Sequence, residues 1–146
     1  MSQSSLVEVL KTILADQYAL YLMTQNYHWN VVGSQFAMLH GLFEGQYRDL
    51  AEAIDTTAEL IRGLGSKTPA TLEGYAKATR IKPGNEEASA EQMLKDLLSD
   101  QDLMQKNLKA VIEVAAAVSD DVVVDFMIQR LTVHRKTAWM LQSCLA

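Results

Sequence analysis

The sequence predicts an all-α fold, a bundle of four long helices with a long crossover between the second and third helices. Apolar residues recur every three or four positions through four long segments, as amphipathic helices require. No segment alternates apolar and polar residues for long enough to predict a strand. The longest break in the helical pattern, residues 66–88, contains both prolines. A chain of 146 residues is long enough to form one domain, residues 1–146, with a buried core.

The first two helices are expected on either side of a short turn. The first helix begins at Ser4 or Ser5 and continues to Asn30, after which the segment Val31–Gly33 breaks the apolar pattern. The second helix starts at Ser34, a predicted N-cap because serine favours this position. It ends near position 63 or 65, both occupied by glycine, which is common at helix C-termini.

The last two helices follow the crossover, which has room for a short helix at Thr71–Thr79. Residues 89–92, with the sequence SAEQ, form a predicted capping box, so the third helix begins there and continues to about Val118. Ser119 is the predicted N-cap of the fourth helix, which continues nearly to Ala146. Four amphipathic helices with one long crossover in the middle match a ferritin-like bundle.

Charge and composition argue against several classes of protein. The formal net charge is -5, whereas DNA-binding proteins depend mainly on Lys and Arg to neutralise phosphates. The single cysteine, Cys144, cannot form an internal disulfide, so a cytoplasmic location is the default expectation. The N-terminal residues lack the basic region and apolar core of a signal peptide. No apolar run approaches the ~18 residues of a membrane span.

Two pairs of polar residues on the second helix form the most informative pattern in the chain. His40 and Glu44 are four residues apart, as are Asp55 and Glu59, and His28 lies on the last turn of the first helix. At 100° per residue, the four positions on the second helix share a face about 100° wide. Two imidazoles and three carboxylates form a mixed nitrogen and oxygen ligand set, which suits iron, manganese or zinc.

The spacing of these pairs predicts a metal site shared between two subunits. At ~1.5 Å rise per residue, His40 and Asp55 lie ~22 Å apart along the helix, whereas metal–ligand bonds of these groups are only ~2.0–2.2 Å. The turn at 31–34 could bring His28 back to His40 and Glu44. The second pair would then come from another copy of the chain. Antiparallel second helices, with a two-fold axis near Asp49–Leu50, would build two identical sites.

Simpler interpretations apply to each of these residues taken singly. Acidic residues four positions from another polar residue are common on any solvated helix, and His28 alone could be a helix-terminal or core histidine. An intrachain di-iron centre of the kind found in ordinary ferritins is disfavoured, because it uses Glu-x-x-His. The positions three residues before the three histidines hold Gln25, Ala37 and Leu131 instead.

The most specific motif in the chain is NYHWNV, residues 26–31, with a second histidine twelve residues after His28. It is accompanied by Gly33, Leu39-His40, Leu42-Phe43-Glu44, Gln46-Tyr47, Ala53-Ile54-Asp55, Ala58-Glu59, Leu131–His134 and Lys136–Leu141. With these positions, nearly the whole chain resembles the Dps family, the ferritin-like miniferritins of bacteria.

The resemblance implies a hollow dodecamer that oxidises Fe(II), preferentially with hydrogen peroxide, and stores ferric mineral inside. It also implies that one subunit supplies His28, His40 and Glu44 as iron ligands and a two-fold-related subunit supplies Asp55 and Glu59. This agrees with the sharing inferred from helix rise. One departure is Glu44, because many members have Asp at this position; Glu keeps the charge but is one methylene longer.

Other residues carry weaker signals. Trp29, beside a ligand, could quench a radical near the iron or pack at an interface. Three acids at the start of the fourth helix could be ordinary N-terminal acids, and the resemblance suggests instead that they line pores at three-fold axes through which iron enters. His134 and Trp139 are interpreted as packing residues, as are Tyr27 and the methionines. The three acids are Asp120, Asp121 and Asp125.

Three functions remain open from the sequence. The first is a peroxide-consuming, iron-storing ferroxidase. The second is a nucleoid-binding stress protein with little catalytic role, disfavoured because residues 1–10 contain no Lys or Arg and the net charge is negative. The third is a non-catalytic helical assembly whose histidines and acids bind zinc or nothing. We expect DNA binding to be weak or absent near neutral pH, and protonation of the histidines below about pH 6.5 to reduce the repulsion.

Overall fold

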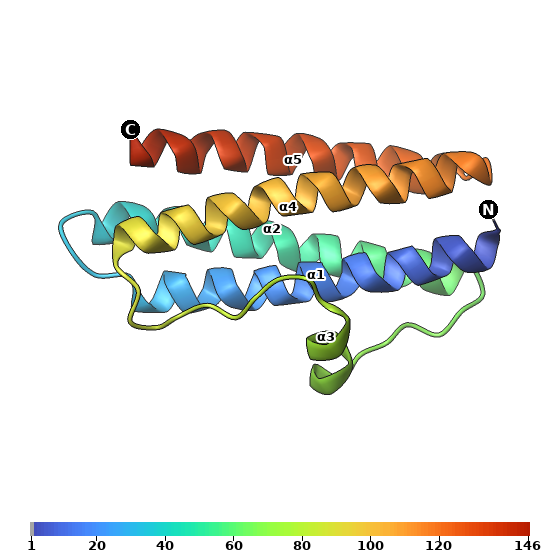
Figure 1. The fold of residues 1–146 in the computed structure, drawn as a ribbon, viewed down its shortest axis with the longest axis horizontal. Helices are drawn as coiled ribbons and strands as arrows, with labels where there is room; N and C mark the ends of the chain where they lie inside the picture. The colour runs from blue at the N-terminus through green and yellow to red at the C-terminus, as the bar shows by residue number, and fades with distance from the viewer. Residues whose placement is uncertain (1) are drawn as a thin grey trace.

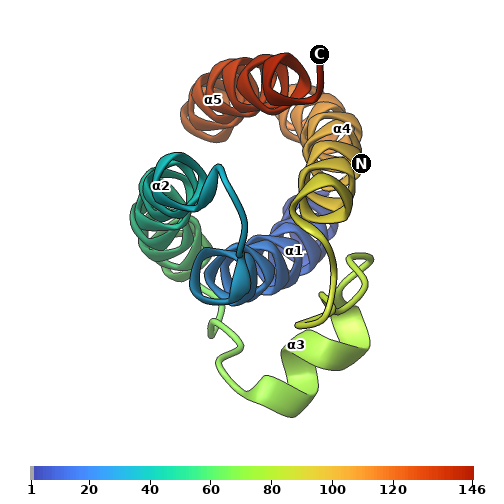
Figure 2. The same ribbon diagram turned by 90° about the vertical axis from the view of Figure 1, so that its left-hand side faces the viewer.

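The computed structural model describes residues 2–146 as four long helices and one short helix, with no strand in this range (Figure 1). The all-α prediction, the long crossover and the short helix within it are therefore confirmed. Figure 2, which looks along the bundle, shows the four long helices surrounding a common axis while the short helix lies outside them. The helices are α1 Gln3–Asn30, α2 Phe36–Gly63, α3 Leu72–Ala78, α4 Ala90–Ala117 and α5 Asp121–Leu145.

Helix packing follows the order expected of a bundle with one crossover. Contacts are most extensive between α1 and α2 and between α4 and α5, the two pairs joined by short turns. The bundle is closed by contacts between α1 and α4 and by fewer contacts between α2 and α5. None of the helices within residues 2–146 is both long and apolar enough to cross a membrane.

One apolar core runs along the bundle and is built from the inward faces of the long helices. Leu10, Leu14, Phe43, Leu97 and Met127 are among its fully buried side chains. Burial of apolar surface at ~25 cal/mol per Å² is the main force that holds such helices together. The packing interpretation is confirmed for Tyr27 and His134, which are buried. It is wrong for Trp139 within one chain, because this side chain is 65% exposed.

Two of the predicted helix starts are shifted by one residue. The N-cap of α2 is Gln35 rather than Ser34, and no side chain caps this helix. The N-cap of α5 is Asp120, whose carboxylate accepts from the Val123 backbone N–H, rather than Ser119. Ser119 instead has φ 58°, the left-handed conformation that reverses the chain between α4 and α5. The carboxylate of Asp120 also complements the positive end of the helix dipole.

The capping box at the start of α4 is half formed. Ser89 accepts from the Gln92 backbone N–H, as predicted, so the helix begins where the sequence places it. The Gln92 side chain, however, donates to Asp96 on the next turn instead of reaching back to the cap. The caps of α1 and α3 are Ser2 and Thr71, whose hydroxyls accept from N–H groups three residues later.

The crossover is tied to the bundle through one buried carboxylate on α1. Asp16 is fully buried and accepts four hydrogen bonds from the crossover, from the Thr79 hydroxyl and from the backbone N–H, Nε and Nη2 of Arg80. Asn107 on α4 donates a fifth, at 3.3 Å. A buried charge must be paired and hydrogen-bonded to be tolerated. These bonds hold the end of α3 against the outside of α1.

Candidate metal centre

The turn between α1 and α2 brings three predicted ligands together at one end of the bundle. One ligand atom from each of His28, His40 and Glu44 lies within 4.8 Å of the other two. Two ligands of a common metal ion, each bonded at ~2.0–2.2 Å, are at most ~4.4 Å apart. The three groups therefore need to close by only a few tenths of an ångström to bind one ion. His28 is buried, whereas His40 and Glu44 are half-buried.

Reciprocal hydrogen bonds orient the two imidazoles. His28 Nδ1 lies 2.7 Å from the His40 carbonyl oxygen, and His40 Nδ1 lies 2.7 Å from the His28 carbonyl oxygen. A carbonyl oxygen only accepts, so each Nδ1 carries the proton and donates. This tautomer leaves a lone pair on each Nε2, the form in which histidine binds metals. The bond made by the other ring nitrogen is the usual way to hold a metal-binding histidine in place.

Ring stacking adds a second constraint on these imidazoles. The rings of His28 and His40 stack with centroids 3.8 Å apart at 14°, and Phe36 stacks on His40 at 5.0 Å. Tyr47 packs edge-on against His28 at 5.2 Å. The rings are thus held by contacts on several sides, so a cation would meet ligands already in place.

Glu44 is shared between the histidine side of the site and a basic residue. Its Oε1 lies 3.8 Å from His28 Nε2, and its Oε2 accepts from Arg48 Nε at 3.0 Å. The hydrogen bond with Glu44 raises the pKa of Arg48, which therefore stays positively charged. Arg48 is 67% exposed and can move away without leaving a buried charge. The longer side chain of Glu44, compared with Asp, is what reaches both partners.

The other predicted pair of ligands, Asp55 and Glu59, lies elsewhere on the same helix. Both residues are exposed, and within residues 2–146 the only cluster of metal-ligand type combines His28, His40 and Glu44. A hydrogen bond with Asp55 and the nearby negative charge raise the pKa of Glu59, since the two carboxylates share a proton more easily than they ionise together. Within one chain the five predicted ligands therefore lie in two groups. His28, His40 and Glu44 form one group, and Asp55 and Glu59 form the other.

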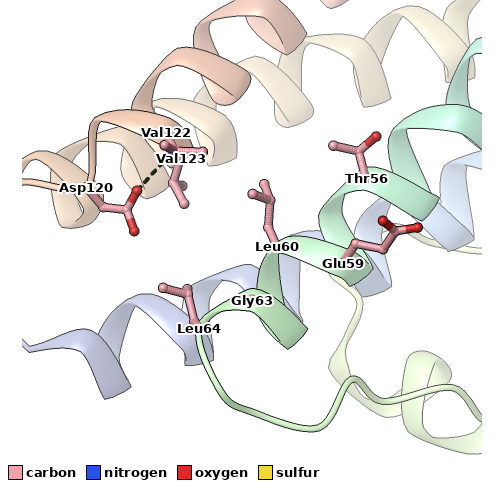
Figure 3. Close-up of a pocket in the computed structure, with 8 residues that line it drawn as sticks. All are labelled: Thr56, Glu59, Leu60, Gly63, Leu64, Asp120, Val122 and Val123. Atoms are coloured by element: carbon pink, nitrogen blue, oxygen red, sulfur yellow. Dashed lines mark hydrogen bonds between the residues drawn. The ribbon is translucent and has the colours of Figure 1, made fainter.

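The acids at the start of α5 take different positions. Glu59, near the end of α2, and Asp120 line one pocket together with apolar residues, and Asp120 is bonded to the Val123 N–H (Figure 3). One carboxylate oxygen of Asp120 therefore caps α5. Asp121 and Asp125 are exposed, and Asp125 accepts from Gln129 Nε2 at 2.8 Å.

The centre of the bundle holds a polar network that the sequence did not predict. Arg130 donates to both carboxylate oxygens of Asp49, at 3.1 and 2.8 Å, and to His134 Nε2 at 3.1 Å. His134 Nδ1 in turn donates to Gln101 Oε1 at 2.6 Å. Burial and the adjacent guanidinium lower the pKa of His134 to about 3, so its imidazole is neutral. Both of its nitrogens are engaged, and the residue links helices rather than binding a metal.

Two neighbours of the metal-ligand cluster make contacts that were not predicted from the sequence: Tyr47, which matched the Dps pattern without an assigned role, and Arg48. Tyr47 is seven residues after His40, two helical turns along the same face, and Arg48 is four residues after Glu44. These spacings are the signals from which both contacts could have been predicted. Trp29, by contrast, is 61% exposed and packs on no other aromatic ring within residues 2–146.

Comparison with known proteins identifies the family. A family model of the ferritin-like domain matches residues 7–146. DNA protection during starvation protein 2 of Bacillus anthracis is 34% identical over 139 residues, which cover 95% of each chain. The chain belongs to the Dps family. A Dps protein from Bacillus brevis has a structure with a TM-score of 0.96 at 30% identity and full coverage of both chains. Dps from Staphylococcus aureus gives a TM-score of 0.96 at 32% identity, over 99% of this chain and 97% of that chain.

Membership of the Dps family explains the architecture and indicates which chemistry is typical of related proteins. The bundle with a short helix in its crossover is the ferritin-like fold. Oligomer formation, iron binding and iron oxidation are typical of Dps proteins, as is DNA protection. The Dps protein of Vibrio cholerae, 28% identical to this chain, is described as a member of a broad superfamily of ferritin-like diiron-carboxylate proteins. The cluster of two imidazoles and a carboxylate is the site in this chain that fits iron.

Proposed function

We propose that this protein oxidises Fe(II) to Fe(III), preferentially with hydrogen peroxide, and stores the ferric product in a hollow dodecamer in the cytoplasm. The observation that carries the proposal is the convergence of His28, His40 and Glu44, with both Nε2 lone pairs available to a cation. Iron is the substrate of this reaction. Two Fe(II) ions supply the two electrons that reduce one peroxide, with two protons, to two water molecules.

Each iron site takes its remaining ligands, Asp55 and Glu59, from a second subunit. Both are exposed, and within residues 2–146 neither forms a salt bridge with Lys or Arg. Oxygen ligands suit the hard ferric ion that the reaction produces. Two such sites lie ~20 Å apart in a two-fold dimer, a distance set by the helix rise between the pairs. Gly41 and Gly45 leave this face of α2 open, since a Cβ at either position would contact nothing in the same chain.

Complementation between two inactive variants tests the shared site. We expect His40→Ala and Asp55→Ala each to abolish rapid Fe(II) oxidation when assembled alone. In a mixed dimer, one site carries both lesions and the other carries none, so mixing during reassembly should restore part of the activity. Stopped-flow absorbance of Fe(III) formation measures the recovery.

The matched control mixes His40→Ala with His28→Ala. Both lesions lie in the same half of the site, so each site of a mixed dimer keeps one lesion and activity stays absent. Recovery in the first mixture but not in the second supports sharing between subunits. Equal recovery in both, or none in either with assembly confirmed by light scattering, would contradict it.

The assembly and the oxidant are tested separately. Light scattering coupled to size exclusion should give the mass of about twelve chains, and a stable monomer at micromolar concentration would contradict both the cage and the shared site. Fe(II) oxidation should be faster with peroxide than with dioxygen. A clear preference for dioxygen would instead indicate a conventional ferritin role.

Acids at the start of α5 extend the proposal to iron uptake. Asp121 and Asp125 are exposed, whereas Asp120 caps the helix, so the first two are the residues we assign to pores at three-fold axes. A negative field at a narrow opening attracts cations. Asp121→Asn with Asp125→Asn should slow mineral formation while leaving initial oxidation with limiting iron intact.

A further inference from the structure

Four of the five tyrosines form a continuous series of ring contacts that begins at the metal-ligand cluster. His28 packs edge-on against Tyr47, with centroids 5.2 Å apart. Tyr47 contacts Tyr21 at 5.8 Å, and Tyr21 contacts Tyr18 at 6.0 Å, both edge-to-face. Tyr18 then stacks on Tyr75 at 4.7 Å and 21°. We call these four residues the tyrosine series.

The tyrosine series crosses three elements and ends near the protein surface. Tyr47 lies on α2, Tyr21 and Tyr18 lie on α1, and Tyr75 lies on the short helix α3 outside the bundle (Figure 1). Tyr18, the third member of the series, is 37% exposed, and Tyr75 at the far end is half-buried, whereas the first member touches a buried ligand. Ring packing alone would account for each pair, but not for a continuous path between an oxidising site and solvent.

The proposed iron chemistry creates a need for such a path. Hydrogen peroxide takes two electrons when it is reduced to water, but a site that holds one Fe(II) can supply only one. If no second donor is in contact, the one-electron reaction releases hydroxide and a hydroxyl radical. Phenols are among the side chains that give up an electron and a proton most readily.

We propose that the tyrosine series is an electron relay that supplies the second electron to peroxide when a site holds a single Fe(II), and that the resulting radical comes to rest at Tyr18 and Tyr75. This inference rests on the proposed function, because peroxide and Fe(II) provide the oxidising event. The balanced reaction consumes one Fe(II), one tyrosine, one peroxide and one proton. It yields one Fe(III), one neutral tyrosyl radical and two water molecules.

Each electron moves inwards by one ring contact while the radical moves outwards. Tyr47 donates first because it alone of the four contacts His28. Tyr21 then reduces the Tyr47 radical, and Tyr18 reduces the Tyr21 radical. The phenol proton of the final radical passes to solvent at Tyr18, the exposed member of the series. Tyr75 holds its own proton more firmly, since its hydroxyl donates to the Pro69 carbonyl and burial raises the pKa of Tyr75.

A second turnover gives the relay a product that can be isolated. When a second oxidising equivalent arrives, radicals on the stacked rings of Tyr18 and Tyr75 couple through ring carbons. One carbon–carbon bond forms, and the hydrogen on each bonded carbon moves to the phenoxyl oxygen, which restores two phenols as dityrosine. The two rings are near-parallel at 21°, with centroids 4.7 Å apart, so the two radicals would form in contact with each other.

The experiment uses the assembled protein loaded with one Fe(II) per site and treated with peroxide, and then loaded and treated a second time so that a second oxidising equivalent reaches each series. We compare the wild type with Tyr47→Phe and Tyr21→Phe, which keep the ring packing but remove the oxidisable phenol. Freeze-quenched electron paramagnetic resonance measures the tyrosyl radical, and mass spectrometry of peptides measures the Tyr18–Tyr75 cross-link. A spin trap records released hydroxyl radical.

Two matched controls isolate the relay. Tyr27→Phe removes the fifth tyrosine, which belongs to none of the ring contacts and bonds to Asp96 instead. Trp29→Phe removes an exposed indole next to His28 in the sequence. A photochemical one-electron oxidant without iron generates tyrosyl radicals directly, and should cross-link Tyr18 to Tyr75 in every variant that retains both residues.

The expected result is a tyrosyl radical and a Tyr18–Tyr75 cross-link in the wild type and in both controls. In Tyr47→Phe, both signals should fall to the level seen without iron while trapped hydroxyl radical rises. In Tyr21→Phe, the radical should stay on Tyr47, and only the Tyr18–Tyr75 cross-link should be lost. An undiminished cross-link in Tyr47→Phe would overturn the relay, as would loss of the radical in Trp29→Phe alone. If wild type consumed Fe(II) and peroxide with no tyrosyl radical, the relay would fail and the proposed function would stand. Absence of iron oxidation in wild type would overturn both.

Discussion

The guanidinium of Arg130 is a buried charge that is held by partners on two helices. Only 6% of its side chain is exposed, and its Nη atoms donate to Asp49 on α2 and to His134 on its own helix, whereas its Nε is buried without a hydrogen-bond partner. A buried cation is tolerated when its charge is paired. This network therefore joins α2, α4 and α5, and removal of one member deprives a buried partner of a hydrogen bond.

Removing the carboxylate of this pair should destabilise the protein markedly. Asp49→Asn leaves the buried guanidinium without an anionic partner, which typically costs ~3–5 kcal/mol for fully buried pairs. Asp49 is 39% exposed, so water compensates in part and we expect ~2–3 kcal/mol. This corresponds to a fall in Tm of roughly 5–10 °C, measured by circular dichroism. Glu52→Gln, an exposed acid on the same helix, should change Tm by less than about 2 °C. Equal effects of the two variants would show that the ion pair contributes no stability.

Asp100 predicts a dependence of stability on pH. Burial, Asp96 and Asp16 raise its pKa to about 7, and its Oδ2 is buried without a hydrogen-bond partner. Between pH ~4 and 7 the folded state therefore holds a proton that the unfolded state has lost. The contribution of this residue to stability is present at low pH and is lost as pH rises through 7.

Asp100→Asn should therefore raise stability above neutral pH. After allowance for its partial exposure, we expect a gain of ~1 kcal/mol, or about 3 °C in Tm, at pH 8. The gain should shrink towards pH 4, where the wild-type carboxyl is protonated as well. Thermal melts at both pH values make the measurement, and a gain independent of pH would exclude titration of Asp100 as the cause.

The elements of the fold could be predicted in number, type and approximate length from apolar periodicity, but some of their ends could not. Ser34 and Ser119 are good N-cap residues by type, yet the caps are Gln35 and Asp120. The choice between adjacent residues depends on how the preceding turn directs the chain, as the positive φ of Ser119 shows. Local sequence specifies which residues can cap, whereas packing of the helices decides which one does.

Docking of the crossover on α1 depended on a contact that no local pattern reveals. Asp16 is 63 residues from Thr79 and 64 from Arg80, so its burial became visible only in the folded chain. From its position in the first helix alone, Asp16 cannot be distinguished from the other acidic residues of the chain. The Asp16 carboxylate accepts from the Thr79 hydroxyl and from the backbone and guanidinium of Arg80, and so fixes the crossover against α1.

Replacing this carboxylate should loosen the crossover without unfolding the bundle. Asp16→Asn keeps the size of the side chain but removes the charge that pairs with Arg80 at 2.6 Å. We expect amide hydrogen exchange at residues 79–82 to accelerate at least about tenfold, equivalent to ~1.4 kcal/mol of local opening. Amides in the middle of α5 should keep their protection. Glu8→Gln, an exposed acid on the same helix, provides the control, and equal exchange in both variants would contradict this anchoring role.

The candidate site shows what one sequence can say about an assembly. His28, His40 and Glu44 could be predicted to converge, because a four-residue turn must bring the end of one helix beside the start of the next. Helix rise alone keeps Asp55 and Glu59 away from them. The reciprocal hydrogen bonds and the tyrosine series could not be predicted, since both depend on rotamers and on the packing of α3. Sharing of the iron site between subunits stays a prediction. It is supported because one chain brings together only three of the five predicted ligands.

Charge on the assembled protein leads to the last prediction, which concerns DNA. Each chain carries a formal net charge of -5, and non-specific affinity for duplex DNA follows the number of phosphates that Lys and Arg neutralise. We therefore expect plasmid DNA not to shift in gels at ~0.15 M salt and neutral pH. Mild acid should weaken the repulsion less than three histidines would suggest, because His134 titrates only at a pKa of about 3. The 146-residue chain is compared with a variant carrying added N-terminal lysines, which should bind. Tight, salt-sensitive binding by the unmodified protein at neutral pH would reveal a basic patch formed between subunits, and would favour nucleoid protection beside iron oxidation.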